Sequence, residues 1–183
     1  MSHIVLVRPK GIADWMKLYR LYLSAFPREE RKPFGIIVKM YRQGKSHIWC
    51  IRRGEEFLGM ATTINGDALI LLDYFAIEKT HRGEGIGTAA MLALQEQYQD
   101  KGLFVEIEST LEAGPEQLQR LKRKHFYMGV GMEDLHTRAN VFGVPMELMG
   151  VRCSLVFAGY QAFYRTNYGT WAAEHLLPIP GEQ

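Results

Sequence analysis

Apolar side chains change their spacing several times along the first forty residues, and each change marks the boundary of an element. A short apolar run over residues 3–8 predicts a first strand. Apolar residues then recur every three or four positions over residues 12–25, which predicts an amphipathic helix that Pro27 ends. After the polar segment 27–32, a second helix is predicted over residues 33–42, because proline suits the first turn of a helix.

The middle of the chain has the pattern of a β-meander. Three runs rich in apolar and β-branched residues, at 47–52, 56–64 and 68–77, predict strands. Short turn sequences separate them, Arg53-Gly-Glu and Asn65-Gly-Asp, and the Asn-Gly pair is a strong hairpin signal. We therefore expect these strands to pair antiparallel.

Beyond residue 77 the pattern alternates between helical and extended runs. A helix over residues 88–100 would deliver the strand 103–107 parallel to the preceding one. The remaining elements are a helix that begins at Pro115, strands at 135–141 and 146–157, and a closing helical extension at about 159–176. The prediction is a single α/β (α+β) domain over residues 1–183, with a mainly antiparallel sheet, flanking helices and one central parallel βαβ step.

The segment from Ile77 to Thr88 holds the chain's most informative chemistry. A glycine-rich turn, Arg82-Gly-Glu-Gly-Ile-Gly87, joins a predicted strand to a predicted helix. Such a turn directs free backbone N–H groups and the positive end of the helix dipole to one point, which favours a phosphate or pyrophosphate. The planar guanidinium of Arg82 adds donors that suit phosphate oxygens.

Composition and charge narrow the function classes. A formal net charge of +2 gives no support to a nucleic-acid partner or a membrane surface. Cys50 and Cys153 are expected to be buried free thiols in a reducing compartment, and no metal-type spacing of cysteine and histidine occurs, so no metal is predicted. Without a recognisable signal peptide or transmembrane run, we expect a cytoplasmic protein.

Two interpretations of the glycine turn remain open. Gly85-x-Gly87-x-x-Ala90 matches a dinucleotide fingerprint, with Glu106 at a suitable distance, which would make the protein an oxidoreductase. Such a fingerprint normally opens a doubly wound domain, whereas here it follows a meander, and too little chain remains for the second half of that fold.

The other interpretation rests on a family resemblance. Arg82-x-x-Gly85-x-Gly87, five residues after Phe75-Ala-Ile77, resembles the acetyl-CoA signature R/Q-x-x-G-x-G/A of the GNAT superfamily of N-acetyltransferases. Phe126-Tyr127-Met-Gly-Val-Gly131-Met132 is similar to the family's F-Y-x-x-x-G-F segment, with methionine in place of the final phenylalanine. The order of predicted elements over residues 3–157 is also similar to that of the family.

The resemblance implies a transferase (an acyltransferase of the acetyltransferase type) that uses acetyl-CoA as cosubstrate and acts on an amine by direct attack. It implies that strand residues hold the pantetheine arm and that the turn cradles the pyrophosphate. It also implies that Tyr127 protonates the leaving thiolate. The Asn often found after the fifth strand has no counterpart in Ser109-Thr-Leu-Glu-Ala-Gly-Pro115. The implied cofactor-binding residues are Phe75, Ala76, Ile77, Arg82, Gly83, Glu84, Gly85, Ile86, Gly87 and Thr88.

A general base must remove a proton from the ammonium group before the amine can attack. Asp73 and Glu106 are the leading candidates, because they lie within predicted strands, where loss of solvent favours a basic carboxylate. Glu108 is a further candidate. Glu29 and Glu30 lie in the polar segment after the first helix, which borders the acceptor site in the family that the chain resembles.

The acceptor is not indicated by any motif, and a small molecule or a peptide amine is possible. An alternative class stays open, a non-catalytic module that binds acyl-CoA and regulates or recruits, because a fold does not fix chemistry. Pairing of subunits into a homodimer, through late strands or the aromatic C-terminal helix, is a further possibility.

Overall fold

The structure is a computed structural model that describes residues 3–180. Two compact units divide the chain. The first comprises the described part of Met1–Asn65 together with Leu72–Gln99, and the second comprises Gly66–Leu71 together with the described part of Asp100–Gln183. Strand β4 (Leu69–Ile77) therefore begins in the second unit and ends in the first.

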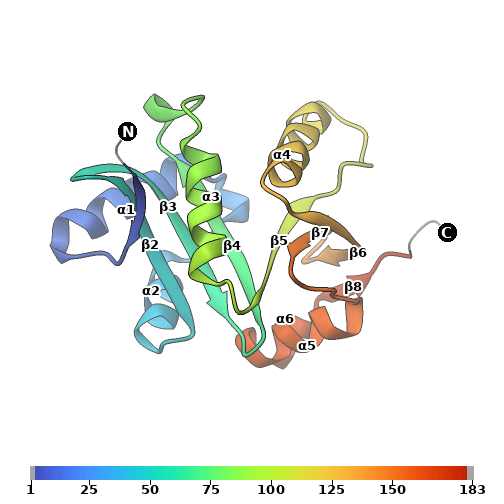
Figure 1. Ribbon diagram of the computed structural model, residues 1–183. Coiled ribbons are helices and arrows are strands. Elements are labelled where there is room, and N and C mark those ends of the chain that lie inside the picture. Colours follow the sequence, from blue (N-terminus) through green and yellow to red (C-terminus); the bar gives the residue numbers. More distant parts are fainter. Residues whose placement is uncertain (1–2, 181–183) are drawn as a thin grey trace. The chain divides into compact units, whose positions relative to one another are not determined.

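In the first unit, the strand order is β1-β2-β3-β4, with β1 antiparallel to β2 and β2 antiparallel to β3 (Figure 1). Its other elements are β1 (Ile4–Val7), α1 (Gly11–Ala25), a 3₁₀ turn (Arg28–Glu30), α2 (Phe34–Arg42), β2 (Ser46–Arg53), β3 (Glu56–Asn65), a second 3₁₀ turn (Lys79–His81) and α3 (Ile86–Gln97).

Each face of this sheet carries its own apolar core, because successive side chains of a strand point to opposite faces. On one face, Tyr74 and Ala76 of β4 pack with Leu18 and Tyr22 of α1 and with α2. On the other, Ile77 and Phe75 pack with Ile86 and other residues of α3. The last part of β4 is thus packed between helices on both faces of the sheet, because its successive apolar side chains point to opposite faces.

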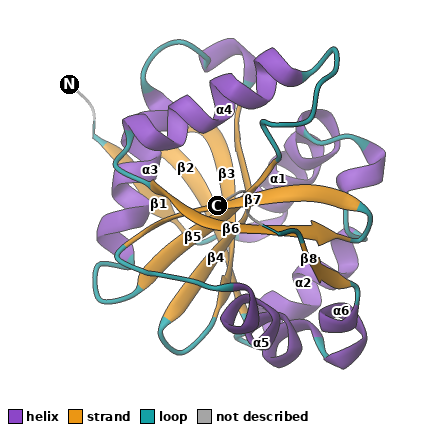
Figure 2. Ribbon diagram, turned by 90° about the vertical axis from the view of Figure 1, so that its right-hand side faces the viewer, coloured by secondary structure: helices purple, strands orange, loops and turns teal. Residues whose placement is uncertain are grey.

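In the second unit, the opening residues of β4 are followed across the sheet by β5, β7, β6 and β8. The pair β4–β5 is parallel, whereas β5–β7, β6–β7 and β6–β8 are antiparallel. Helix α4 and the pair α5–α6 lie on opposite sides of these strands (Figure 2). The bounds are β5 (Gly102–Glu108), α4 (Gln117–Gly129), β6 (Glu133–Val141), β7 (Val144–Val151), α5 (Phe157–Tyr168), α6 (Thr170–Glu174) and β8 (Leu176–Pro178).

The predicted fold class is confirmed: the sheet is mostly antiparallel with one parallel pair and flanking helices. Two predicted elements differ at the C-terminal end. The strand predicted to reach residue 157 ends at Val151, because Arg152 turns to a φ of 57°. The closing helix is broken at Gly169, with a φ of 92°, into α5 and α6, and the short strand β8 follows. The sequence pattern did not indicate β8.

Both cysteines are free thiols, as predicted, but they differ in burial. Cys50 is fully buried on β2, and burial raises its pKa to about 12. Cys153 is only half-buried. Within residues 3–180, no helix is both long and apolar enough to cross a lipid bilayer.

Gly59 on β3 is required for the close approach of β3 to β4. A Cβ atom at this position would press on the carbonyl oxygen of Ala76 and lie 3.2 Å from the Cα of Ile77. We expect Gly59→Ala to destabilise the protein by about 1–3 kcal/mol, because the backbone of β4 must shift. Urea unfolding would measure this.

Gly35→Ala is the matched control. Gly35 lies in α2, and nothing comes within 4 Å of an added Cβ. This substitution should leave stability unchanged or raise it by up to ~1 kcal/mol, since alanine is the better helix former. Equal destabilisation of both variants would contradict the packing argument.

Candidate functional site

The predicted phosphate-binding turn has the backbone geometry that the sequence indicates. Gly83 and Gly85 have φ angles of 84° and 75°, a left-handed conformation that side chains with a Cβ rarely adopt. Gly85 is the residue before α3, and the first amide of this helix to be bonded is that of Ala89, which donates to the carbonyl oxygen of Gly85 at 3.1 Å. The amides of Ile86, Gly87 and Thr88 therefore precede the helical hydrogen bonds and can serve an anion.

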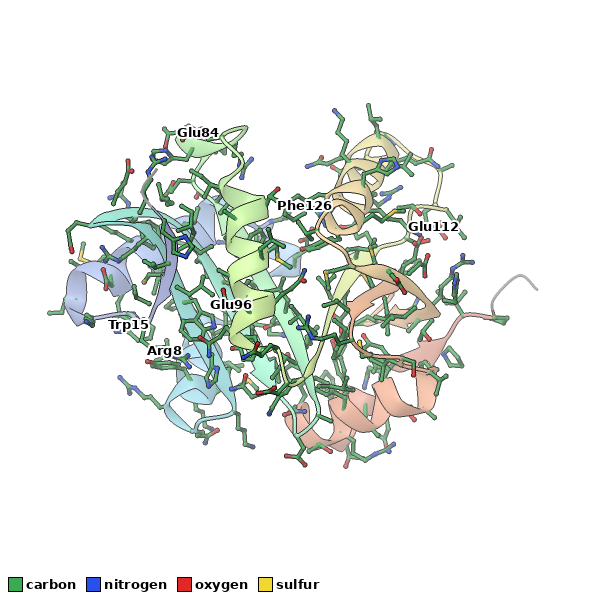
Figure 3. All side chains as sticks on the ribbon, viewed as in Figure 1. Arg8, Trp15, Glu84, Glu96, Glu112 and Phe126 are labelled. Atoms are coloured by element: carbon green, nitrogen blue, oxygen red, sulfur yellow. The ribbon has the colours of Figure 1, made fainter. Side chains whose placement is uncertain are left out.

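Charged side chains brace the same turn. Arg82 donates from Nε to the carbonyl oxygen of Ile77 at 3.3 Å, which ties the turn to the end of β4. Glu84, labelled in Figure 3, lies 3.6 Å from a guanidinium nitrogen of Arg53 and 3.4 Å from Nδ1 of His81. Glu84 therefore has one basic partner at the end of β2 and another in the turn itself.

Tyr127 lies in the third-last position of α4, and its main chain closes the helix. The amide of Met132 donates to the carbonyl oxygen of Tyr127, and that of Gly131 to the carbonyl oxygen of Met128, both at 3.0 Å. With Gly131 at a φ of 83°, this is a Schellman motif, and the side chains of Tyr127 and Met132, at the two positions whose apolar contact often accompanies this motif, are both buried. The F-Y-x-x-x-G-M segment is thus first of all a helix-ending signal.

The phenol of Tyr127 lies in a low-dielectric environment. Its side chain is buried against Phe126, with ring centroids 5.2 Å apart. Burial raises the pKa of Tyr127 to about 12, and the charge of Arg123 opposes this only in part. The phenol is therefore protonated at neutral pH, as a proton donor must be.

Asp73, a predicted candidate base, lies in β4 two residues before Phe75. Its carboxylate accepts a hydrogen bond from Nζ of Lys32 at 2.6 Å, within an ion pair in which the Asp73 side chain is 9% exposed. Lys32 belongs to the segment between α1 and α2. The polar segment 27–32 thus contacts the strand predicted to bind the cofactor through the side chain of Lys32.

Glu106, the other leading candidate, lies in β5 and is held by α5. Its Oε1 accepts hydrogen bonds from the hydroxyls of Tyr160 at 2.5 Å and Tyr164 at 2.7 Å. Burial and the neighbouring carboxylate raise the pKa of Tyr160, so its phenol stays a donor. Two phenol donors stabilise the ionised form of a carboxylate. Glu106 in β5 and Tyr127 in α4 both belong to the second unit.

A buried ion-pair cluster in the second unit was not predicted. Glu147 of β7 is 1% exposed and lies 2.5 Å from Nζ of Lys124, which also lies 2.7 Å from Asp134. Oε1 of Glu147 accepts from the amide of Thr110 at 2.6 Å and from the hydroxyls of Thr110 and Ser109. Lys124 thus joins α4 to β6 and β7, three residues before Tyr127.

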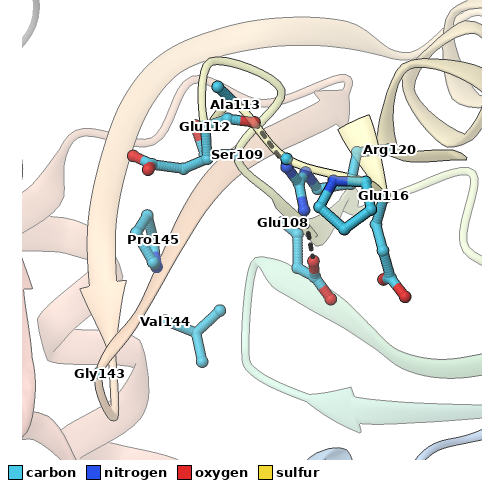
Figure 4. A pocket seen from close by; sticks show the side chains of 11 residues that line it. Glu108, Ser109, Glu112, Ala113, Glu116, Arg120, Gly143, Val144 and Pro145 are labelled. Atoms are coloured by element: carbon cyan, nitrogen blue, oxygen red, sulfur yellow. Dashed lines mark hydrogen bonds and ion pairs between the residues drawn. The ribbon is translucent and has the colours of Figure 1, made fainter. Parts of the chain in front are cut away.

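A cavity of about 360 Å³ lies beside this cluster, where the segment after β5 meets the β6–β7 turn (Figure 4). Arg120 of α4 crosses its wall, 3.6 Å from the carboxylate of Glu108 and bonded at 2.5 Å to the carbonyl oxygen of Glu112. Glu108, a further candidate base, therefore already has a guanidinium partner.

A strand that ends in a glycine turn opening a helix, within a mostly antiparallel sheet, is the arrangement that the family resemblance implied. Comparison with protein families agrees: residues 15–125 match the model described as the acetyltransferase (GNAT) family. The chain therefore belongs to the GNAT acetyltransferase family, as its motifs indicated. No curated protein matches the sequence significantly.

Solved structures share the fold at low sequence identity. An acetyltransferase of the GNAT family from Bacteroides thetaiotaomicron is 19% identical, with a TM-score of 0.73, over 92% of this chain and 99% of that one. An aminoglycoside 6'-N-acetyltransferase complexed with coenzyme A is 15% identical, with a TM-score of 0.64, over 81% and 95%. A ribosomal-protein alanine N-acetyltransferase from Escherichia coli is 13% identical, with a TM-score of 0.59, over 84% and 96%.

The Lys124–Glu147 pair should make stability depend on pH. Burial opposes ionisation of Glu147, but hydrogen bonds from Lys124 and Thr110 outweigh it and lower its pKa below the ordinary 4.5. When the pKa of a carboxyl group is lower in the folded than in the unfolded protein, its ionisation stabilises the folded state. This contribution is complete above the pKa of the unfolded state and is lost as the pH falls through the pKa of the folded state. We expect Glu147→Gln to be less stable than the wild type at pH 7 and to lose less stability below about pH 4.5.

Urea unfolding at pH 7, 5 and 4 measures this difference. Glu96→Gln, on the exposed side of α3, serves as control and should keep the acid dependence of the wild type. An unchanged acid dependence in Glu147→Gln would show that the buried pair does not govern acid stability.

Proposed function

We propose that this protein transfers the acetyl group of acetyl-CoA to an amine. The single observation that carries the proposal is the left-handed glycine pair, Gly83 and Gly85, which opens α3 directly after β4 in a chain of the GNAT acetyltransferase family. Amides at the start of α3 bind the pyrophosphate. The main chain of β4 from Phe75 to Ile77 binds the pantetheine arm, as an added strand would.

The reaction is a direct attack on the thioester. The amine nitrogen forms a bond to the acetyl carbon, the carbon–sulfur bond breaks, and an amide and free CoA result. A backbone N–H near Phe75 stabilises the developing oxyanion. Tyr127 donates its phenolic proton to the departing thiolate, which the raised pKa of this buried tyrosine supports, because the phenol is protonated at neutral pH.

The attacking nitrogen must first lose a proton. Asp73 and Glu106 remain the proposed bases, and their surroundings differ. Asp73 is ion-paired with Lys32, whereas Glu106 is bonded to two phenols. Comparison of Asp73→Asn with Glu106→Gln in a pH–rate profile would separate them.

The structurally similar proteins differ in the amine that their names state, an aminoglycoside for one and an alanine of a ribosomal protein for another. This range supports an amine acceptor for the present chain, either a small molecule or a peptide. A cytoplasmic location and self-association into a dimer stay predictions.

Gly85→Asp should abolish binding of acetyl-CoA. The substitution puts a β-carbon on a residue with a φ of 75° and a negative charge beside the pyrophosphate. Calorimetric titration should give micromolar affinity for the wild type, about −8 kcal/mol, and no binding for the variant. NADH and NADPH serve as negative controls, for which we expect no binding. Retained binding of acetyl-CoA would remove the proposed phosphate site, and binding of NADH alone would favour the dinucleotide interpretation.

Tyr127→Phe separates an enzyme from a CoA-binding module. The carbonyl of Tyr127 caps α4, so the fold should survive loss of the hydroxyl. In an enzyme, kcat should fall by about 10²–10⁴-fold, while the affinity for acetyl-CoA holds. Release of free CoA thiol gives the rate. Undiminished turnover would exclude the phenol as the proton donor, and a wild type that binds acetyl-CoA yet acetylates no amine would favour the binding module.

A further inference from the structure

A second cavity, of about 320 Å³, lies in the first unit where α1 leads into α2. Its walls differ in chemistry: one is aromatic and apolar, and the other is cationic. The lining residues are Tyr19, Tyr22, Leu23, Arg28, Arg31, Lys32, Pro33 and Phe34.

The aromatic wall is partly open to solvent. Phe34 packs against Tyr19 and Tyr22, with ring centroids 5.0 and 5.4 Å apart. Tyr19 is nevertheless 45% exposed and Leu23 is 42% exposed. Apolar side chains that line a cavity and remain this exposed offer a surface on which the apolar part of a ligand can be buried.

The cationic wall is held rigidly by two buried tyrosines. The hydroxyl of Tyr22 donates to the carbonyl oxygen of Lys32 at 2.8 Å, and that of Tyr74 donates to the carbonyl oxygen of Glu30 at 2.9 Å. The amide of Lys32 in turn donates to the hydroxyl of Tyr74 at 3.0 Å. The backbone that presents Arg28 and Arg31 is therefore fixed before any ligand arrives.

The charges of this wall are not balanced. Lys32 is paired with Asp73, but neither Arg28 nor Arg31 forms an ion pair with any side chain that the structure describes. Nε of Arg31 is also a buried donor without a hydrogen-bond acceptor. A buried donor without a partner is costly and rare in folded proteins, and an anion in the cavity would satisfy it. A guanidinium forms two parallel hydrogen bonds to a carboxylate or to a phosphate, and the carboxylate is the one that amino acids and peptides carry together with an amine.

The same segment adjoins the strand proposed to bind the acyl carrier. Tyr74, which bonds both Glu30 and Lys32, directly precedes Phe75 in β4. A ligand anchored at Arg31 is therefore held beside this strand by groups of the same compact unit.

We propose that this cavity binds the acceptor, and that the acceptor is an amine with an apolar body and a carboxylate, such as an α-amino acid or a short peptide. This inference rests on the proposed acetyl transfer. Arg31 binds the carboxylate, Arg28 adds positive charge, and the apolar body packs on Tyr19 and Phe34. The carboxylate does not react. The amine nitrogen forms the amide bond while the thioester carbon–sulfur bond breaks.

Matched pairs of acceptors test the proposal. L-phenylalanine and L-leucine are compared with their primary amides, which have the same amine and apolar body but lack the carboxylate. Glycyl-phenylalanine and its amide distinguish a peptide from a free amino acid. Release of CoA thiol gives kcat/KM. Spermidine, a cationic amine without a carboxylate, serves as the control acceptor. We expect at least one acid to exceed its amide by tenfold or more.

Arg31→Ala should remove this preference, lowering kcat/KM at least tenfold for the acid and leaving that for the amide unchanged. Arg42→Ala, an exposed arginine at the end of α2 that does not line the cavity, is the control. A melting curve and acetyl-CoA titration check that the variant is folded. If Arg31→Ala unfolds, Arg28→Ala takes its place, with the same selective loss expected.

The outcomes separate the two proposals. If acetyl-CoA binds and spermidine or the amides are acetylated as well as the acids, acetyl transfer stands and the carboxylate specificity is overturned. An Arg31→Ala variant that loses acid and amide activity equally also overturns it. If acetyl-CoA neither binds nor reacts, the proposed function itself fails, and with it the assignment of this cavity to an acceptor.

Discussion

Burial of both faces of β4 is the constraint on which the first unit depends. Tyr74 and Ala76 pack into the core formed with α1 and α2, while Phe75 and Ile77 pack into the core formed with α3. A strand packed from both sides cannot slip by one residue, since a slip would exchange every side chain between the two cores. The main-chain groups of β4 and the turn that follows it are therefore held in a fixed position, as the proposed binding of a thioester there requires.

The sequence predicted the regular part of this arrangement well, because periodicity reports on burial. The apolar runs of β4 and the helical spacing in α1 gave the right elements, and the glycine-rich turn lies between a strand and a helix as predicted. The C-terminal end was predicted less well. Nothing in the apolar pattern signals that Arg152 takes a positive φ or that Leu176–Pro178 pairs with β6, because both depend on distant partners.

The candidate site shows the same division between local and distant information. A sequence motif can identify Tyr127 as a candidate residue. It cannot predict that Asp73 pairs with a lysine or that Glu106 accepts hydrogen bonds from two tyrosines. Asp73 was placed by alternation alone, and its pairing with Lys32 depends on how the segment between α1 and α2 folds back on the strand. That segment contains both acidic and basic residues, and sequence reasoning chose Glu29 and Glu30. The structure places Arg28 and Arg31, rather than Glu30, along the cavity wall.

The Schellman motif at the end of α4 divides the duties of one residue between its main chain and its side chain. The carbonyl group of Tyr127 accepts the hydrogen bond that ends the helix, and any residue could supply this group. The phenol takes no part in that hydrogen bond. With Tyr127 as the proposed proton donor, a single-nucleotide change from tyrosine to phenylalanine would alter reactivity without altering architecture. On that proposal, descendants of this chain could pass between catalysis and simple ligand capture in one mutational step, in either direction, and remain folded throughout.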